Sequence, residues 1–191
     1  AELVRNLPTA VTVAASSKDL ALKVAEIFHH HSMRIYLSDD IAGVSISGAL
    51  KNIIAIAAGI SDGMGFGNNA RAALITRGIA EMTRFGVSHG AKEDTFMGLA
   101  GIGDLMLTCT GQYSRNREVG LLLAEGKILS EILLSLGHVA EGVNACYEVN
   151  KRIKSDFDMP IVKKVFQVLT NKISAAEAVK SLLSRSLRPE N

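Results

Sequence analysis

The sequence predicts a mainly α-helical domain preceded by one short βαβ unit. Two runs typical of strands lie within the first 38 residues, whereas apolar residues at helical spacing dominate the rest. Glycine divides that remainder, because twelve of the 17 glycines fall between Gly43 and Gly103 and none follows Gly142. We therefore expect a glycine-jointed helical region in the middle of the chain and a plainer helical region at its end.

The N-terminal part predicts a strand, a helix and a second strand. Residues 10–15 are rich in β-branched side chains, and residues 33–38 alternate between apolar and polar. Between them, residues 16–19 offer helix caps ahead of an apolar stripe. Two strands and one helix cannot bury both faces of a parallel sheet. We therefore interpret residues 1–42 as the end of a larger α/β domain and residues 43–191 as a separate helical domain.

The middle region predicts a central helix. Residues 47–60 contain no proline and are apolar nearly all round, as expected of a helix buried on every side. A glycine-rich loop follows at residues 63–67. Asn68 or Asn69 is then expected to cap a second helix, which ends near Gly86.

The last third of the sequence predicts further helices with clear starting signals. Ser114 and Ser174 are typical helix caps, and Pro160 suits a first helical position. The expected helices cover residues 114–126, 129–136, 141–153, a segment from Pro160, and 174–183.

Composition excludes several classes of function. The chain has 191 residues, a formal net charge of +2 and 5% aromatic residues, which disfavours a nucleic-acid binder. No segment approaches the roughly 20 apolar residues of a membrane span, and no signal peptide is recognisable at the start. The two cysteines, Cys109 and Cys146, do not form a disulfide scaffold or a metal motif, so a reducing cytoplasm is expected.

Lys51 is the most informative residue. It lies inside the apolar helix, where an ammonium group is costly to bury unless it has a partner or a use. Burial lowers the pKa of a lysine, and a lysine with a lowered pKa exchanges protons with a carbonyl or alcohol oxygen. The competing interpretation is that the apolar stem lies along the helix and the ammonium reaches water.

Two further segments carry candidate binding groups. Asp104 follows two glycines, which indicates either a helix cap or a carboxylate facing a site. The segment Ser114-Arg115-Asn116-Arg117 opens a helix, where free N–H groups, a hydroxyl and two guanidiniums suit an anion. Cations are unfavourable at that end of a helix, so two of them favour a bound anion over a solvated cap.

Other patterns are interpreted as structural. His29, His30 and His31 point in different directions on a helix, so we expect no metal site there. His89 and His138 are isolated and are interpreted as structural. The glycine clusters do not follow the spacing of a dinucleotide-binding loop, and no strand precedes them.

Five segments in a fixed order make the sequence recognisable. They are Gly48-Ala49-Leu50-Lys51-Asn52, Gly63 to Ala73 (with Gly65, Gly67, Asn68, Asn69 and Arg71), Gly98 to Leu105, Thr108-Cys109-Thr110 and Ser114-Arg115-Asn116-Arg117. Together they strongly resemble the bacterial NAD(P)-dependent glycerol-3-phosphate dehydrogenases, and Val139-Ala140-Glu141-Gly142 matches as well. The resemblance extends over the whole chain.

The resemblance implies a fold and a set of roles. The family has a Rossmann domain followed by an all-helical substrate domain, an architecture shared with 6-phosphogluconate dehydrogenase. By resemblance, Lys51 is the catalytic acid/base of NAD- or NADP-linked reduction of dihydroxyacetone phosphate to sn-glycerol 3-phosphate, a step toward glycerophospholipids. The implied substrate-binding residues are Lys51, Asn52, Asp104, Thr108, Ser114, Arg115 and Asn116. The implied cofactor-binding residues are Arg115, Val139 and Glu141.

The family's glycine-rich cofactor loop is not in this sequence, so we expect the chain by itself to be inactive. A sister dehydrogenase of the same architecture is an alternative, which Ser114-Arg115-Asn116 beside Lys51-Asn52 disfavours. A helical interaction or dimerisation module is a second alternative, but it gives no reason for Lys51. The choice between NADH and NADPH, and whether the protein is a homodimer, stay open.

Overall fold

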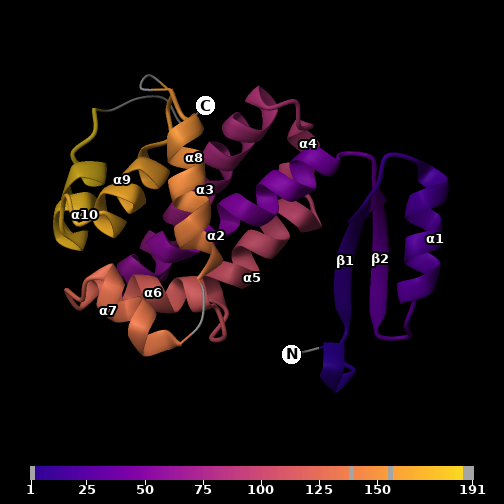
Figure 1. Cartoon of the computed structure of the whole chain (residues 1–191), viewed down its shortest axis with the longest axis horizontal. Coiled ribbons are helices and arrows are strands. Elements are labelled where there is room, and N and C mark those ends of the chain that lie inside the picture. Colours follow the sequence, from indigo (N-terminus) through magenta and orange to yellow (C-terminus); the bar gives the residue numbers. More distant parts are fainter. Residues whose placement is uncertain (1–2, 138–139, 155–156, 187–191) are drawn as a thin grey trace.

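A computed structural model describes residues 3–137, 140–154 and 157–186. Figure 1 shows a small sheet unit at one end of the molecule and a large group of helices at the other. The mainly helical fold class predicted from the sequence is thereby confirmed. The boundary between residues 42 and 43 as a domain boundary stays a prediction.

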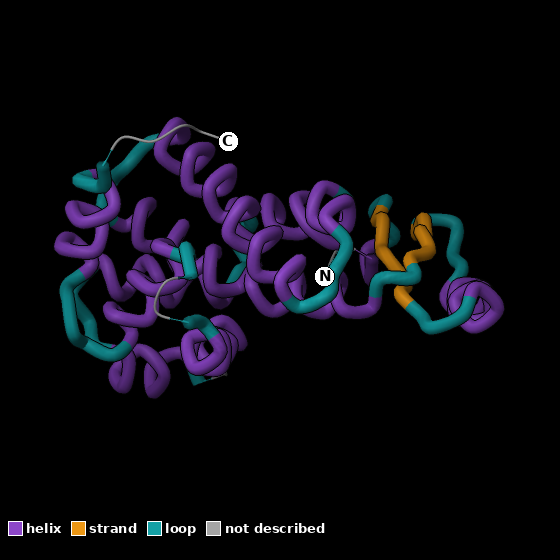
Figure 2. Tube along the Cα trace, turned by 90° about the horizontal axis from the view of Figure 1, so that it is seen from above, coloured by secondary structure: helices purple, strands orange, loops and turns teal. Residues whose placement is uncertain are grey.

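The N-terminal unit is the predicted βαβ arrangement. Strands β1 (Thr9–Ala14) and β2 (Met33–Ser38) pair in parallel, with Thr9 opposite Met33 and Ala14 opposite Ser38. Helix α1 (Lys18–Phe28) connects them, and the hydroxyl of Ser17 caps it by accepting from the N–H of Leu20 at 3.2 Å. A single helical turn (Leu3–Arg5) precedes β1. Figure 2 shows the two strands side by side, with α1 on their outer side.

Helix α2 (Ile41–Gly63) is the axis of the helical part and is longer than the sequence predicts. The expected start at Ser47 is wrong, because the helix begins at Ile41 and Gly43 lies inside it. Asp40 is the cap, and its carboxylate accepts from the N–H of Gly43 at 2.8 Å. A side chain at Gly43 would collide with Asp40 and with Thr95, so this glycine gives room for the cap where it would usually signal a break.

Contrary to the expectation that no segment has the length of a membrane span, helix α2 is long and apolar enough to cross a membrane by length and composition alone. In this fold, 56% of its most apolar window is buried inside the protein. It packs against α3, α5, α6 and α8 and supplies fully buried side chains such as Leu50, Ile53 and Ile56. We therefore interpret it as the core helix of a globular fold.

The remaining helices surround α2 (Figure 1). They are α3 (Asn68–Ser88), α4 (Glu93–Met97), α5 (Asp104–Thr110), α6 (Arg115–Ala124), α7 (Leu129–Leu136), α8 (Glu141–Arg152), α9 (Pro160–Leu169) and α10 (Ala175–Leu183). Ser114 and Ser174 cap α6 and α10 as predicted, and Pro160 is the first residue of α9. The prediction that Asn68 or Asn69 caps α3 is wrong, because Gly67 holds the cap position and both asparagines lie in the first turn.

Helices α2 and α6 cross with their backbones in direct contact, so that no side chain fits between them at two glycines. A methyl group added to Gly59 would lie 2.0 Å from the carbonyl oxygen of Arg117. One added to Gly120 would lie 2.1 Å from the carbonyl oxygen of Ile56. The two glycines therefore allow α6 to lie directly against the C-terminal part of α2.

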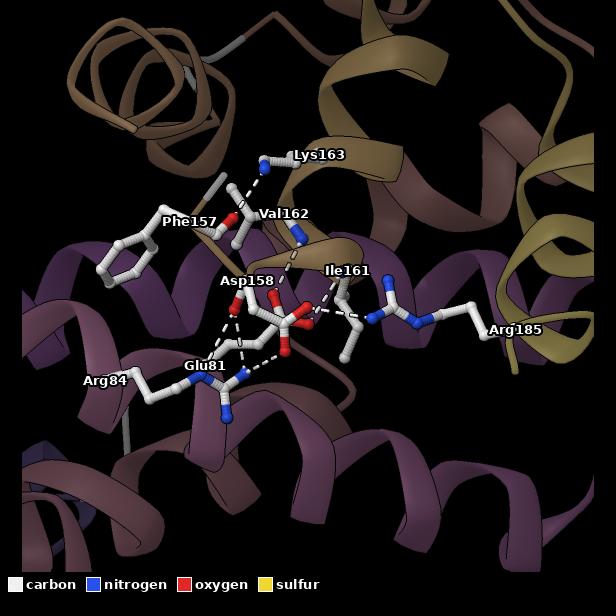
Figure 3. A network of polar contacts seen from close by, with 8 residues as sticks. All are labelled: Glu81, Arg84, Phe157, Asp158, Ile161, Val162, Lys163 and Arg185. Atoms are coloured by element: carbon white, nitrogen blue, oxygen red, sulfur yellow. Dashed lines mark hydrogen bonds and ion pairs between the residues drawn. The ribbon is translucent and has the colours of Figure 1, made fainter. Parts of the chain in front are cut away.

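Glu81 is a buried carboxylate that joins α3 to the start of α9 (Figure 3). Its side chain is 2% exposed and accepts from the N–H groups of Ile161 at 2.8 Å and Val162 at 3.2 Å. Beside it, Asp158 pairs with Arg84 and with Arg185 (Figure 3). Burial raises the pKa of Glu81 to about 7, although the two N–H donors and Arg84 oppose this increase.

Glu81→Gln is expected to change how stability depends on pH. A carboxyl whose pKa is higher in the folded state favours folding when protonated, so its contribution is complete below about pH 4.5 and is lost as the pH rises through about 7. The free energy of unfolding of the original protein, relative to Glu81→Gln, should fall by about 3 kcal/mol from pH 4.5 to 8. Thermal unfolding of both proteins across this pH range measures this difference. If the difference in free energy of unfolding stays the same at every pH, the expectation is contradicted.

Candidate active site

The ammonium group of Lys51 is paired with the carboxylate of Asp104. Lys51 lies on α2, its side chain is 20% exposed, and its Nζ donates to Oδ2 of Asp104 at 2.5 Å. The sequence predicts that a lysine in this helix needs a partner or a route to water, and the structure provides a partner. A short contact between an ammonium group and a carboxylate holds the proton-bearing nitrogen at a fixed point.

Asp104 is not a helix cap, which corrects one of the two sequence interpretations. Gly103 holds the cap position of α5, and Asp104 is the first residue of that helix. A π-helical turn (Leu99–Gly103) precedes it, and Gly101 lies so close to Phe96 that no side chain would fit there. This irregular turn directs the Asp104 carboxylate toward α2. The hydroxyl of Thr108 donates to the Asp104 carbonyl at 2.6 Å, one turn further along.

Two buried amides connect α2, α6 and α8. Nδ2 of Asn116 donates to Oδ1 of Asn52 at 3.0 Å, and Oδ1 of Asn116 accepts from the N–H of Gly142 at 2.8 Å. Nδ2 of Asn52 in turn donates to the Gly48 carbonyl at 3.0 Å and lies 3.4 Å from Oε2 of Glu141. The amides thus place the predicted cofactor residue Glu141 next to the helix that carries Lys51.

The two arginines at the start of α6 have different surroundings. Arg117 is occupied inside the protein, because its Nε donates to Oδ2 of Asp62 at 2.7 Å. The expectation that both arginines favour a bound anion is therefore wrong for Arg117, whose counter-charge is internal. Arg115 is exposed and forms no hydrogen bond or ion pair with the part of the chain that the structure describes. Ser114 caps the helix by accepting from the N–H of Arg117 at 3.3 Å.

The predicted site residues fall into two connected groups. Lys51, Asp104 and Thr108 form one, and Asn52, Asn116 and Glu141 form the other. Because Lys51 adjoins Asn52 and Arg115 adjoins Asn116, the direct contact between the two amides brings the lysine segment and the arginine segment together. Val139 lies outside the described residues.

The histidines and cysteines take no part in this arrangement. Nδ1 of His89 donates to the Phe85 carbonyl at 2.8 Å, and the His89 ring stacks on the Phe85 ring. His30 contacts Ser32. His138 lies outside the described residues. Burial raises the pKa of both Cys109 and Cys146 to about 12, so neither is a reactive thiol. Within the described ranges, no group of three His, Cys, Asp or Glu side chains is placed to hold a metal ion.

A cavity of about 800 Å³ lies elsewhere, between α2, α3, α9 and α10. Its lining is mostly apolar and includes Phe66, Leu74, Ile161 and Val165. None of the predicted site residues lines it. The candidate active site is therefore identified by the Lys51–Asp104 ion pair and the amide contacts, because the large cavity lies away from it.

Comparison with known proteins identifies the family of the chain. Residues 40–180 match the family described as "NAD-dependent glycerol-3-phosphate dehydrogenase C-terminus". The chain belongs to this family. The matched segment includes the lysine, the aspartate and the Ser-Arg-Asn cap, although the match itself assigns no role to them.

Relatives of the whole chain carry the name glycerol-3-phosphate dehydrogenase (NAD(P)+). One from Methylobacillus flagellatus is 61% identical over all 191 residues, which make up 58% of its length. One from Cupriavidus taiwanensis is 53% identical over 99% of this chain and 56% of its own. The crystal structure of glycerol-3-phosphate dehydrogenase from Coxiella burnetii superposes with a TM-score of 0.92 at 43% identity, covering 96% of this chain and 57% of that one. The chain thus spans just over half the length of these relatives.

Sequence reasoning missed one charged group in this dehydrogenase-family domain. Asp62, near the end of α2, accepts from Nε and Nη2 of Arg71 at 2.9 and 2.7 Å as well as from Arg117. A single aspartate near a glycine-rich loop gives no local signal of this role. The presence of an arginine in the first turn of both α3 and α6, where a cation is unfavourable, could have indicated a shared anionic partner.

Proposed function

We propose that the protein containing this chain is a glycerol-3-phosphate dehydrogenase, which interconverts dihydroxyacetone phosphate and sn-glycerol 3-phosphate with NAD or NADP. The observation that supports this most is the Lys51–Asp104 pair, held on α2 beside the amide contact to the start of α6. A proton donor and a cationic helix start are the two groups that a small phosphorylated ketone requires.

Lys51 acts as the general acid in the reducing direction. Its ammonium donates a proton to the C2 oxygen of the ketone, and its positive charge stabilises the developing alkoxide. In the oxidising direction the neutral amine accepts the proton of the C2 hydroxyl. Asp104 orients Nζ through the 2.5 Å contact and has a second oxygen with which to accept from a substrate hydroxyl.

The start of α6 receives the phosphate group. Ser114 contributes a hydroxyl, and Arg115 presents a guanidinium that is exposed and unpaired in the described chain. Arginine suits a dianionic phosphate because its planar fork binds two oxygens. Asn116 is already engaged by Asn52 and Gly142, so it holds the helix start in place and has one N–H left to donate.

The residues present fit the edge of a nicotinamide dinucleotide. When bound, the dinucleotide supplies the hydride. Arg115 and Glu141 would hold it from the helical side. The exposed guanidinium of Arg115 suits a cofactor phosphate, and the carboxylate of Glu141 suits a hydroxyl or an amide.

A steady-state assay of the complete protein tests the function. Oxidation of NADH or NADPH should depend on dihydroxyacetone phosphate, and dihydroxyacetone, which lacks the phosphate, should be a far poorer substrate. A protein that instead reduces a 2-ketoacid, or oxidises 6-phosphogluconate, would overturn the proposal in favour of a sister enzyme. We also propose a cytoplasmic location and a homodimer, which fractionation and light scattering test.

Arg115→Ala in the complete protein is expected to raise KM for dihydroxyacetone phosphate roughly 10- to 100-fold, the value of one lost charge-assisted bidentate contact. The matched control is Arg152→Ala, which removes an equally charged, exposed side chain whose partner among the described residues is Glu148 on its own helix. The control should keep its KM. Equal KM values for both variants would show that Arg115 does not bind the phosphate.

A further inference from the structure

Asp62 holds two guanidiniums at once. Its side chain is only 5% exposed. Oδ1 accepts from Nε and Nη2 of Arg71, and Oδ2 accepts from Nε of Arg117, with distances between 2.7 and 2.9 Å. Three charge-assisted hydrogen bonds on a shielded carboxylate fix the positions of both arginines.

The three residues come from three different helices. Asp62 lies at the end of α2, Arg71 in the first turn of α3 and Arg117 in the first turn of α6. The positive end of a helix dipole disfavours an arginine in a first turn, and the Asp62 carboxylate reverses this for α3 and α6 together. The group carries one positive charge in excess, so it attracts an anion to the neighbouring helix start.

Arg117 connects Asp62 to the proposed phosphate-binding segment, Ser114 to Arg117. Its backbone N–H donates to the Ser114 hydroxyl, and its carbonyl lies against Gly59 at the crossing of α2 and α6. The backbone of the first turn is thus held by the Gly59 contact, and the side chain is held by Asp62. Arg115 lies in the sequence between Ser114 and Arg117, which are joined by this hydrogen bond, and its side chain is exposed.

We propose that Asp62 is a positioning residue, which acts through Arg117 to hold the first turn of α6 where Ser114 and Arg115 receive a phosphate group. The inference rests on the function proposed above. Asp62 does not touch the substrate in this role, and the lysine on the same helix keeps its own partner, Asp104. Loss of Asp62 should therefore weaken recognition of the phosphate while proton transfer continues.

The test compares two substrates in Asp62→Asn of the complete protein. KM for dihydroxyacetone phosphate should rise about tenfold or more, with kcat changed by no more than about threefold. The value of kcat/KM for dihydroxyacetone, measured at a saturating concentration of the reduced nicotinamide cofactor, should stay within about twofold. A residue that is merely structural would reduce kcat/KM for both ketones equally, and that result would overturn the inference.

Asp158→Asn is the matched control. Asp158 also bridges two arginines, Arg84 and Arg185, but it lies at the α9 side of the fold, away from the predicted site. It should leave the ratio of kcat/KM for the two ketones unchanged. A change of that ratio as large as in Asp62→Asn would also overturn the inference, because the effect would then be general.

A second variant decides if Asp62→Asn does not fold. Arg117→Lys keeps the positive charge but removes the Nε–H group from which Asp62 accepts, so KM for the phosphorylated ketone should rise about three- to tenfold. An unchanged KM would overturn the inference. The proposed function is tested separately, since it fails if the unmodified protein does not reduce dihydroxyacetone phosphate at all.

Discussion

Lys51→Ala in the complete protein is expected to lower kcat for dihydroxyacetone phosphate by at least about 100-fold, the usual lower range for loss of a general acid. Its Tm should move by only about 3 °C or less, because the Asp104 partner is 36% exposed and water screens the lost ion pair. Removing the ammonium leaves the C2 oxygen without a proton donor, and other contacts to the substrate are unaffected. Steady-state kinetics and thermal unfolding on one preparation measure both quantities.

Lys92→Ala is the matched control for this prediction. Lys92 also forms a close pair with an aspartate, Asp39, but both side chains are well exposed and neither belongs to the predicted site. It should retain kcat. A large decrease of Tm in Lys51→Ala with activity retained would mean that the lysine serves the fold and not the reaction.

Gly59→Ala is expected to destabilise the protein by about 3 kcal/mol, which lowers Tm by roughly 6–12 °C for a unit of this size. The added methyl group would lie 2.0 Å from the Arg117 carbonyl, and backbone atoms on both helices would have to move apart. Since the first turn of α6 moves with Arg117, phosphate recognition should weaken along with stability. Differential scanning calorimetry measures the first effect, and KM measures the second.

The same substitution at Gly48, on the same helix, should change the stability of the protein in the opposite direction. A methyl group at Gly48 meets nothing within 4 Å. Alanine is the better helix former, so Gly48→Ala should stabilise the protein by up to about 1 kcal/mol. Equal Tm values for the two variants would show that the crossing at Gly59 is looser than the structure has it.

Local signals in the sequence were sufficient for most elements and for none of the long-range contacts. Ser114, Pro160 and Ser174 set the starts of α6, α9 and α10 through groups within one turn, so they could be predicted. The start of α2 could not, because the room that Gly43 gives depends on Asp40 and on Thr95, which is 52 positions away.

The candidate site divides in the same way. That Lys51 requires a partner follows from its apolar helix, but that the partner is Asp104 depends on how the π-helical turn is placed against α2. The resemblance named Asp104 without a physical reason for it. Asp62 was missed altogether, since its two arginines lie nine and 55 positions along the chain.

The peptide that joins β2 to α2 has a mechanical consequence. It consists of only Asp39 and Asp40, and both are anchored: Asp39 to the Lys92 ammonium, and Asp40 to the Lys92 N–H and the Thr95 hydroxyl. Rotation of the strands about this joint would break all of these attachments together. The sheet and helix α2 should therefore move together as one rigid unit, so that the strands and Lys51 keep a fixed separation.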